Sequence, residues 1–410
     1  MRLKTLEKNK KILIVTEFFY PEEFKINDVA LSWKDNGYDV DVLTLAPTYP
    51  LGKVFSGCKN GFLSKSKWQG VTVYRVHATI GYKSSAFKKI LKYLNFMIFG
   101  SIVALFIGKK YDYVFGFNAS ALTSMLPAVL IRKLYKKPVT LWVQDVWPDS
   151  VYAYGFKKTR MLSFCLNGFV KFIFHNVENI AVSSKGFESK LTPYVKDNMI
   201  FNYAPNWADD LNMGLTPALL SDDSKIQLTF AGNIGKVQNL KNIILAFNGL
   251  NTRYAKRVQL NIIGDGSELK KLEALNIKNN IVFHGKKPRD EMARYYKASD
   301  FLIVSLVDKA IFKVTVPAKT QTYIAAKKPI IAIINGDTAD IIKDNNLGFV
   351  ASPSDVRGIK NVFIKSINMG KDDLLQFTEN CDRLNEEVFN KEVIVDHLLK
   401  LTTTGKGWKI

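Results

Sequence analysis

Short apolar segments that end in small-residue turns recur in the second half of this sequence. Residues 228–231, 260–263 and 281–283 are such runs, and a glycine lies within two residues of the end of each. Glycine at a strand-to-helix turn lets the backbone approach a phosphate closely, and the N-terminus of the following helix favours anions. We therefore expect this half to hold a nucleotide diphosphate. The candidate turn residues are Gly232, Asn233, Gly235, Gly264 and Gly266. Gly264 and Gly266 also fit a purely structural turn, which Asp265 would organise.

These apolar runs are too short for helices and fit strands that are buried on both faces of a sheet. The polar and helical sequence between them is typical of a doubly wound parallel α/β sheet, whose ligands lie beyond the carboxyl ends of the strands. The first half repeats this layout, with strands expected at residues 11–15, 39–44, 71–76, 113–116, 138–143 and 178–184. A chain of 410 residues is too long for one ordinary core, which favours two Rossmann-like domains facing across a cleft.

Periodicity fails between residues 203 and 220, which predicts the interdomain linker, centred on residues 203–210. We expect an N-terminal domain over residues 1–205 and a C-terminal nucleotide-binding domain over residues 206–380. Residues 381–410 should hold a final helix, from about Arg383 to Leu399, that packs back on the first domain. Ser183 and Ser184 are expected to cap a helix that begins near Gly186.

The charge is unevenly distributed. The net charge is +21, and residues 1–205 hold 29 basic and 14 acidic side chains. From Val42 to Tyr111 there is no Asp or Glu, against eleven Lys or Arg. This stretch contains the apolar residues 93–107, which are bracketed by Lys88, Lys89, Lys92, Lys109 and Lys110. Fifteen residues are fewer than the roughly 20 that cross a bilayer, but a basic apolar helix can lie on an anionic membrane surface. A buried crossover helix beneath the sheet is the alternative.

Several classes of protein fit the sequence poorly. Cys58, Cys165 and Cys381 lie far apart, which favours free thiols in a reducing cytoplasm over a disulfide framework or a zinc site. Residues 1–10 are basic but precede an apolar strand rather than a signal-peptide core. The basic residues accompany no nucleic-acid-binding motif. Residues 16–21 (TEFFYP) stand where a dinucleotide-binding dehydrogenase would have its glycine fingerprint.

Several motifs, spread over nearly the whole chain, together resemble the nucleotide-sugar glycosyltransferases of family 4, which have the GT-B fold. The pattern is also similar, more narrowly, to bacterial O-antigen and capsule transferases that transfer L-fucosamine. The motifs are EFFYPEEFKIND at residues 17–28, APTYPLG at 46–52, QDVWPDS at 144–150, PNWAD at 205–209, FAGNIGK at 230–236 and IGDGS at 263–267.

The resemblance implies transfer of an N-acetylated hexose, such as N-acetyl-L-fucosamine, from a UDP-sugar donor to a polyprenyl-diphosphate-linked saccharide. Such an enzyme would act in O-antigen, capsule or lipopolysaccharide synthesis. It would be cytoplasmic and peripheral on the inner face of the cell membrane, with no nucleic-acid partner. The family also implies retention of the anomeric configuration. Neither a cofactor nor a metal is expected, because cationic side chains and helix ends serve the diphosphate in this fold.

The donor side needs positive groups where charge builds on the leaving diphosphate. Lys236 and Lys319 are the candidates, although either lysine could be a solvated surface residue. Thr320, Gln321 and Thr322 would open a helix whose hydroxyls and N–H groups meet phosphate or ribose. His284 resembles the strand end near which the uracil base packs, and a structural role for it in the core or a turn is an alternative.

The acceptor side is expected at the strand ends of the first domain. Asp145 follows a strand, at a place where many relatives have His-Asp and this chain has Gln144 before the aspartate. A carboxylate there can accept a proton from an acceptor hydroxyl or orient it. Glu17, Asn27 and Asp149 are further candidates for acceptor contacts. Asp149 also fits a helix N-cap, and Glu22 and Glu23 are expected to be solvated.

One departure from the family pattern concerns a pair of acids. Many members carry two Glu residues separated by seven positions, and the second contacts the ribose. The matching positions here are Val314 and Thr322, so this acidic pair is absent. Two other functions share the expected architecture: a UDP-sugar 2-epimerase, and a non-catalytic binder of sugar nucleotides or nucleic acid.

Overall fold

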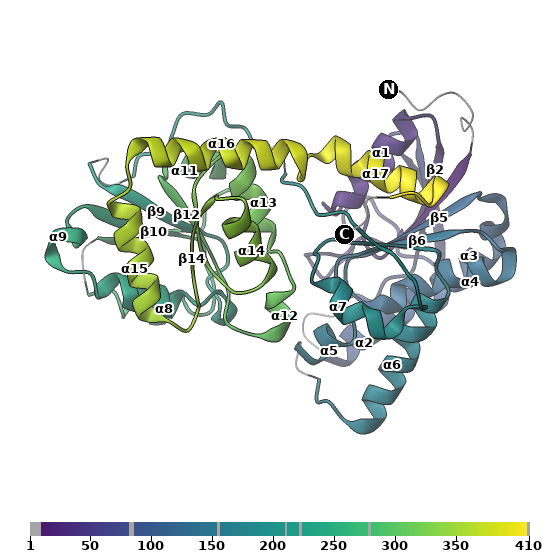
Figure 1. Cartoon of the computed structure of the whole chain (residues 1–410). Coiled ribbons are helices and arrows are strands. Elements are labelled where there is room, and N and C mark those ends of the chain that lie inside the picture. The colour runs from purple at the N-terminus through teal and green to yellow at the C-terminus, as the bar shows by residue number, and fades with distance from the viewer. Residues whose placement is uncertain are drawn as a thin grey trace. The chain divides into compact units, whose positions relative to one another are not determined.

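The computed structural model describes residues 10–81, 86–153, 156–209, 211–220, 224–277 and 280–407. The basic N-terminal residues 1–9, the side chain of Lys89 and Asp210 of the expected linker lie outside this description. The chain forms two compact units, Met1–Pro205 with Glu392–Ile410, and Asn206–Lys391 (Figure 1). The chain passes from the first unit to the second between Pro205 and Asn206, which is where the sequence analysis puts the domain boundary.

The first unit is built on an eight-stranded sheet of order β3-β4-β2-β1-β5-β6-β7-β8. All neighbouring pairs are parallel except β3 and β4, which form an antiparallel hairpin that the sequence patterns did not indicate. The strands are β1 (Lys11–Thr16), β2 (Asp39–Leu45), β3 (Leu63–Trp68), β4 (Val71–Val76), β5 (Tyr113–Asn118), β6 (Val139–Val143), β7 (Asn179–Val182) and β8 (Phe201–Tyr203). The strand order reverses between β1 and β5, and ligands of open α/β sheets bind at such switch points.

Helices cover this sheet on both faces, as its apolar, doubly buried strands require (Figure 1). They are α1 (Lys25–Asp35), α2 (Ala86–Asn95), the π-helical η1 (Phe96–Gly100), α3 (Ser101–Ile107), η2 (Gly108–Lys110), η3 (Leu122–Met125), α4 (Leu126–Tyr135), α5 (Asp149–Ala153), α6 (Arg160–His175), α7 (Phe187–Leu191), η4 (Thr192–Tyr194) and α17 (Lys391–Thr404). The N-cap of α7 is Gly186, where the sequence predicts the helix to begin, and capping by Ser183 and Ser184 stays a prediction.

The apolar segment of the acid-free stretch is longer than predicted, because helix runs without a break from α2 through η2. Residues Ile90–Lys110 are long and apolar enough to cross a membrane by length and composition. A third of that window is buried, and Phe96, Val103 and Ala104 lie beneath the sheet and α4. The crossover-helix interpretation therefore holds for one face of this segment, and its other face carries exposed apolar side chains.

The second unit has a six-stranded, wholly parallel sheet of order β11-β10-β9-β12-β13-β14. Its strands are β9 (Ile226–Ala231), β10 (Val258–Ile263), β11 (Ile281–Gly285), β12 (Phe301–Ser305), β13 (Ile330–Ile333) and β14 (Gly348–Ala351). Its helices are η5 (Lys236–Gln238), α8 (Leu240–Asn248), α9 (Thr252–Ala255), α10 (Leu269–Glu273), α11 (Met292–Ala298), α12 (Ala310–Lys313), α13 (Ala318–Ala325), α14 (Asp337–Asp344), α15 (Val356–Ile367) and α16 (Lys371–Glu387). The switch point here lies between β9 and β12.

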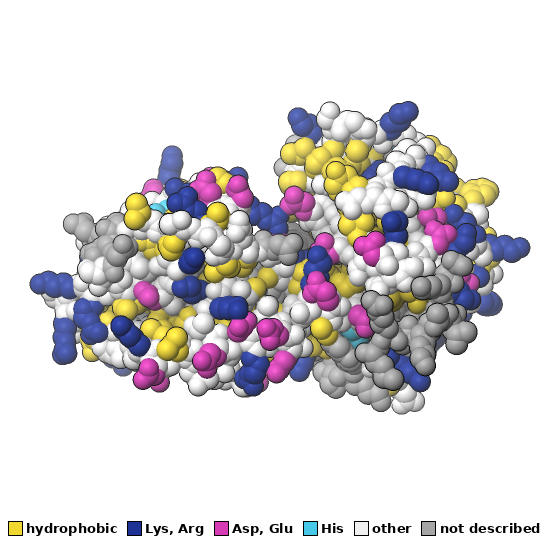
Figure 2. All heavy atoms as spheres, turned by 90° about the horizontal axis from the view of Figure 1, so that it is seen from above, with side chains coloured by type: hydrophobic (Ala, Val, Ile, Leu, Met, Phe, Trp, Pro, Cys, Tyr) yellow, Lys and Arg dark blue, Asp and Glu magenta, His cyan; other side chains and the backbone are white. Residues whose placement is uncertain are grey.

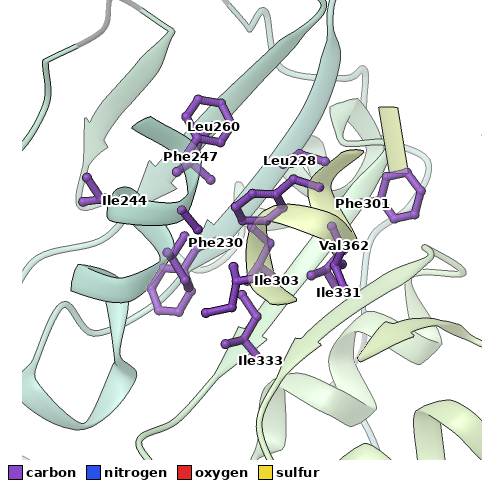
Figure 3. Close-up of a cluster of buried hydrophobic side chains, with 14 of the residues drawn as sticks. Leu228, Phe230, Ile244, Phe247, Leu260, Phe301, Ile303, Ile331, Ile333 and Val362 are labelled. Carbon is purple, nitrogen blue, oxygen red and sulfur yellow. The ribbon is translucent and has the colours of Figure 1, made fainter. Parts of the chain in front are cut away.

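Each face of the second sheet buries a separate apolar cluster. On one face, side chains of the central strands meet α8 and α15, where the rings of Phe247 and Phe363 lie 5.8 Å apart (Figure 3). On the other face Tyr323 and Ile324 of α13 pack with Leu302 and Ile330. This double burial explains why the strands are apolar throughout and why they could be recognised in the sequence.

The C-terminal helix differs from its prediction. The expected helix from Arg383 to Leu399 is in fact the end of α16 and the beginning of α17. Cys381 and Leu384 on α16 are buried in the second unit, so residues 381–391 do not belong with the first. α17 lies on the first unit, where the indole N–H of Trp33 donates to the carbonyl of Val395 over 3.1 Å.

Candidate functional site

The end of β9 brings together two residues that the sequence analysis singled out. Lys319 is the second residue of α13, and its Nζ atom lies 3.8 Å from the centroid of the Phe230 ring. A Cβ atom built on Gly232, whose φ is +138°, would collide with the Nζ and Cε atoms of Lys319. The absence of a side chain at Gly232 therefore makes room for this ammonium group at the switch point of the second sheet.

Lys319 is a mostly enclosed cation without an acidic partner among the residues that the structure describes. Burial in apolar surroundings lowers its pKa to about 7, because the charged form loses water and gains no counter-charge. An anion that entered beside Lys319 would restore that charge. The site is thus suited to a phosphate or carboxylate group.

The contacts of Gly264 and Gly266 fit the structural turn that was the alternative for these glycines. The N–H of Gly232 donates to the carbonyl of Ile263 over 2.8 Å, and the N–H of Gly264 donates to Gly285 over 2.9 Å. A Cβ on Gly264 would collide with the Gly232 carbonyl, and one on Gly266 with the backbone of Ile234. These glycines let the turns after β9, β10 and β11 pack backbone against backbone.

The N–H groups of Gly235 and Gly266 also donate within the protein. The Gly266 N–H donates to the Asp265 carboxylate over 2.7 Å, and the Gly235 N–H donates to the Gln238 side chain over 3.1 Å. The N–H groups of these four glycines therefore have partners within the protein, and their approach to a diphosphate stays a prediction. Asp265 does organise its turn, and Asn233 is exposed there.

Three neighbouring residues of α13 differ in whether their side chains already have hydrogen-bond partners. Thr320 is buried, and its hydroxyl has no hydrogen-bond partner within the described part of the chain. Gln321 is buried with its amide facing the carbonyls of Pro317 and Ala318. The Thr322 hydroxyl donates to the Ala318 carbonyl over 3.0 Å. α13 begins at Ala318, so these residues form its first turns rather than its opening.

The other two donor-side candidates have weaker support from their surroundings. Lys236 begins η5 and is exposed. His284 contacts the Asn261 side-chain oxygen through Nε2 over 2.8 Å, and its ring meets Tyr295 edge-on with centroids 6.0 Å apart. Burial, with a smaller contribution from the charge of Lys287, lowers the pKa of His284. These contacts fit the structural role that was the alternative for His284.

The positions of the missing acidic pair lie on α12 and α13. Val314 is the C-cap of α12, and no acid occupies either position. The nearest acid along the chain is Asp308, between β12 and α12, which pairs with Lys313 over 3.1 Å. Hydrogen bonds from Lys313 and Asn335 lower the pKa of Asp308. No sequence pattern predicted this ion pair.

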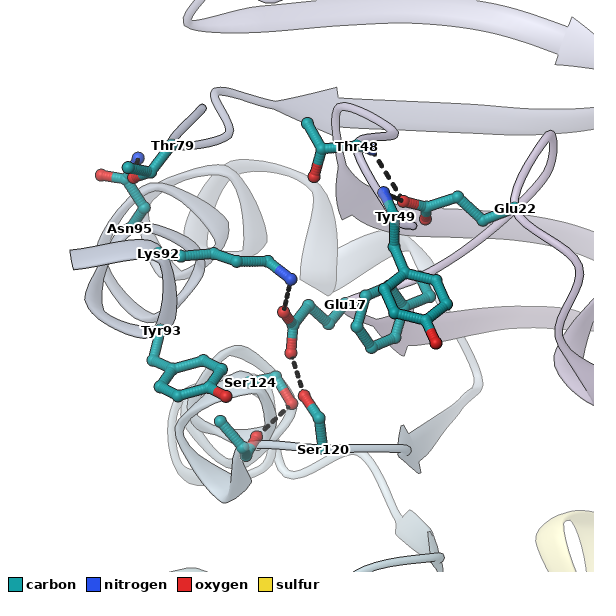
Figure 4. A network of polar contacts seen from close by, with 12 residues as sticks. Glu17, Glu22, Thr48, Tyr49, Thr79, Lys92, Tyr93, Asn95, Ser120 and Ser124 are labelled. Atoms are coloured by element: carbon teal, nitrogen blue, oxygen red, sulfur yellow. Dashed lines mark hydrogen bonds and ion pairs between the residues drawn. The ribbon is translucent and has the colours of Figure 1, made fainter. Parts of the chain in front are cut away.

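In the first unit, Glu17 lies at the end of β1 beside the switch point. Its carboxylate forms an ion pair with Lys92 of α2 over 2.7 Å and accepts a hydrogen bond from the Ser120 hydroxyl, which follows β5 (Figure 4). The Lys92 ammonium also lies 4.6 Å from the centroid of the Phe18 ring. Lys92 is buried, so its expected place in a surface basic cluster is wrong. Ser120 was missed, although its position after a strand is the signal that identified Glu17.

A largely apolar cavity of about 620 Å³ opens beside this group. Its polar lining includes Lys92 of α2, Ser120 and Asp145 at the ends of strands, and Thr123 of η3. Burial raises the pKa of Asp145 to about 6, although hydrogen bonds from Ser150 and Val146 partly oppose that rise. The apolar lining consists mainly of Phe18, Tyr49, Ile90, Tyr93, Leu94, Trp147, Val151, Phe156, Leu162 and Leu166. Asp145 therefore has the environment of a proton acceptor beside a binding cavity.

Asn27 and Asp149, the other acceptor candidates, have structural partners instead. The Asn27 amide donates to the Glu22 carbonyl over 2.7 Å, and its oxygen accepts from the Tyr20 N–H over 3.1 Å. Asp149 begins α5 and pairs with Lys190 over 3.2 Å. Neither residue lines the cavity, and their contacts with an acceptor stay a prediction.

Glu22 was expected to be solvated, but it is buried. Its carboxylate accepts from the Thr48 and Tyr49 N–H groups over 2.8 and 2.6 Å. It thereby fixes the loop after β2 to the loop after β1. Burial raises the pKa of Glu22 to about 7 against the opposing effect of these hydrogen bonds. No cluster of His, Cys, Asp or Glu suited to a metal ion occurs among the residues described.

Comparison with known proteins shows that the chain is similar in sequence to glycosyltransferases. Residues 216–384 match the family model "Glycosyl transferases group 1". The chain is 23% identical over 253 residues to the probable glycosyltransferase WbjE of Pseudomonas aeruginosa, and 25% identical over 257 residues to the putative colanic acid biosynthesis glycosyl transferase WcaI of Escherichia coli K12. These matches cover 58% of this chain and span about three fifths of each relative, 62% and 61%.

A solved structure extends the likeness to the fold of the whole chain. The Anabaena protein HepE in complex with UDP and glucose aligns with a TM-score of 0.64 at 12% identity. The alignment covers 97% of this chain and all of HepE. The chain thus has the GT-B fold, and residues 216–384 of its second unit are similar to the glycosyl transferases group 1 family.

Proposed function

We propose that this chain is a glycosyltransferase that moves a sugar from a UDP-sugar to a lipid-linked saccharide during synthesis of a bacterial surface polysaccharide. The observation that carries the proposal is the Lys319 ammonium, enclosed beside Gly232 and without an acidic partner in the described residues. HepE, which has the same fold, was solved with UDP and glucose. WcaI is named for colanic acid biosynthesis, which supports a polysaccharide product.

Lys319 would act where charge develops. As the bond between the anomeric carbon and the diphosphate oxygen breaks, negative charge builds on the departing UDP. A cation already held in apolar surroundings stabilises that charge without reorganisation. The Thr320 hydroxyl, one residue further along α13 and without a partner among the described residues, would donate to phosphate or ribose. Such a contact would supply part of what the missing Glu at Thr322 provides in relatives.

Asp145 would act on the acceptor. The acceptor hydroxyl attacks the anomeric carbon, and its proton passes to a base as the new C–O bond forms. Asp145 lines the cavity, and its raised pKa suits it to accept this proton or to orient the hydroxyl. Glu17 and Lys92 neutralise each other, so the cavity favours an uncharged sugar over a phosphate.

The finer parts of the proposal come from the family resemblance. They are an N-acetylated donor sugar such as N-acetyl-L-fucosamine, retention of anomeric configuration, membership of family 4, and a polyprenyl-diphosphate-linked acceptor. No metal takes part in this scheme. A peripheral position on the inner face of the cell membrane is supported by the exposed apolar side chains of α2 and α3 in a segment without acidic residues.

UDP binding is the first test. Isothermal titration calorimetry should detect binding to the wild-type protein, a large loss with Lys319→Ala, and no change with Lys365→Gln, a control on α15 that is exposed. Absence of UDP binding to the wild type would reject the proposal. Release of UDP from a UDP-sugar panel is then compared with and without bacterial lipid extract. A transferase needs the extract, whereas a 2-epimerase changes the sugar without it and a binder releases nothing.

A further inference from the structure

The outward face of α6 carries an apolar stripe that the rest of the described chain leaves uncovered. Met161 and Phe164 are 79% and 81% exposed, whereas Phe172 is 36% exposed and has the Lys133 ammonium 5.1 Å from its ring centroid. Their spacing, with Cys165 and Gly168 between them, places all five on one side of the helix. The opposite side buries Val170, Ile173 and Phe174. A helix that is apolar on both sides is unusual at a water-exposed surface, which indicates that something covers the outer side.

Within the sequence of α6 and its immediate flanks, the charges are all of one sign. Residues 150–177 contain no Asp or Glu. Lys157, Lys158 and Arg160 are exposed at the start of α6, and Lys171 is exposed near its end. On the face seen in Figure 2, by contrast, acidic and basic side chains lie among one another. Apolar side chains next to exposed cations are the composition that binds anionic membrane surfaces.

α6 also borders the acceptor cavity. Leu162 and Leu166, on the inner side of the helix, line the cavity together with Ile90 and Leu94 of α2. Ile90, Leu91 and Leu94 are themselves partly exposed. In Figure 1, α2 and α6 lie near each other in the first unit. Whatever covers the outward face of α6 therefore lies near the entrance to the cavity that contains Asp145.

We propose that the outward face of α6, comprising Met161, Phe164 and Phe172 with the flanking Lys157, Lys158 and Arg160, is the surface that docks this protein on an anionic lipid bilayer. This adds a contact on α6 to the membrane contact proposed for the acid-free segment 93–107, whose Phe106 is also largely exposed. The inference deepens the proposed function, because a lipid-linked acceptor could then reach Asp145 without leaving the bilayer.

Vesicle co-sedimentation of the full chain tests the apolar part of the surface. The probes are vesicles of phosphatidylcholine alone and vesicles that also contain phosphatidylglycerol. Met161→Gln/Phe164→Gln should weaken binding to the mixed vesicles by about tenfold or more, since both side chains would leave the lipid. The matched control is Ile277→Gln/Leu375→Gln, which removes two similarly exposed apolar residues from the second unit. The control should bind as the wild type does.

A charge variant tests the preference for anionic lipid. Lys157→Gln/Lys158→Gln/Arg160→Gln should lose about fivefold in affinity for each charge removed, and only on vesicles with phosphatidylglycerol. Equal loss on both vesicle types would overturn the electrostatic part of the proposal.

Two outcomes would overturn the docking surface itself. In one, Met161→Gln/Phe164→Gln binds vesicles as tightly as the wild type. In the other, the wild type is a dimer in vesicle-free buffer and this variant a monomer, so the stripe joins two copies of the chain. UDP titration separates this inference from the proposed function. The docking variants should bind UDP normally, and a wild-type protein that binds vesicles but not UDP would refute the function alone.

Discussion

The Nζ atom of Lys92 lies 2.7 Å from a carboxylate oxygen of Glu17, and the two side chains are 5% and 3% exposed. The pair connects α2 to the end of β1, and the Ser120 hydroxyl extends it to the end of β5. It thus spans the point where the strand order of the first sheet reverses. Glu17 cancels the charge of Lys92. Among the described residues that line the neighbouring cavity, Asp145 is therefore the one side chain whose charge is not neutralised by an ion pair.

Breaking this pair should destabilise the first unit. Lys92→Met leaves the Glu17 carboxylate buried without its counter-charge, which costs about 3–5 kcal/mol of unfolding free energy. Lys109→Gln, which removes an exposed lysine beyond α3, should change that free energy by less than about 0.5 kcal/mol. Urea unfolding of the three proteins measures both effects.

The double variant Glu17→Gln/Lys92→Met decides whether the loss comes from the unpaired charge. It should recover most of the stability lost in Lys92→Met, because no charge then remains buried. If the single and double variants unfolded at the same urea concentration, the electrostatic explanation would be wrong.

The sequence predicted the fold well because its evidence is local and repeated. Most strands of both sheets are apolar runs bounded by turns, and burial on both faces makes such runs conspicuous. β3 escaped prediction because it is a mostly exposed edge strand with a polar sequence, Leu63–Trp68. Gly232 and Lys319 were both identified, but sequence spacing cannot show that one makes room for the other's ammonium group.

Lys92 shows why the site was harder to predict. Helical spacing puts Lys88 and Lys92 on one face of α2, and the sequence offers no reason to separate them. The structure exposes Lys88 and buries Lys92, because Glu17 and Phe18 at the end of β1 lie against one turn only. Pairings between residues far apart in the chain depend on tertiary packing that no local pattern contains.

Substituting Gly232 should impair the donor site while Lys319 is retained. In Gly232→Ala the new methyl group would occupy the position of the Lys319 Nζ and Cε atoms, and a φ of +138° disfavours any L side chain. We expect UDP affinity to fall at least tenfold, toward that of Lys319→Ala. Gly61→Ala is the control, since a Cβ there meets nothing within 4 Å. UDP affinity equal to wild type in Gly232→Ala would remove the spatial link between the two residues.

UDP binding should depend on pH through Lys319. Burial lowers its pKa to about 7, so the free protein carries this charge below pH 7 and loses it above. Because the diphosphate favours the charged form, affinity should be constant below pH 7 and fall by up to about tenfold per pH unit above it. Binding at pH 8 should take up a proton, which calorimetry in buffers of different ionisation enthalpy detects.

Lys319→Arg provides the matched comparison for this linkage. A guanidinium keeps its charge at every pH of the assay, so the variant should bind UDP with little dependence on pH between 7 and 9 and without proton uptake. A pH dependence that is the same in wild type and Lys319→Arg would assign the linkage to another group.

Ionisation of Asp145 should determine how the transfer rate changes with pH on the acidic side of the pH–rate profile. Its pKa is raised to about 6, and only the carboxylate form accepts a proton, so the transfer rate should rise as the pH increases through 6 and level off above. Asp145→Asn should bind UDP normally, transfer about a hundredfold more slowly and lack this pH dependence. Asp149→Asn, four residues along and paired with Lys190, should keep the wild-type profile.

The raised pKa of Asp145 also predicts how the stability of the folded protein depends on pH. The folded pKa of Asp145 lies above its ordinary value of 3.8, so the protonated carboxyl is the form that the fold prefers. Its stabilising effect is present below about pH 4 and is lost as the pH rises through 6. Asp145→Asn, which mimics the neutral form, should therefore gain thermal stability relative to wild type at pH 8 and not at pH 4. Thermal unfolding at the two pH values measures this difference. If Asp145→Asn were equally destabilised at both pH values, burial would not disfavour the charged carboxylate of Asp145.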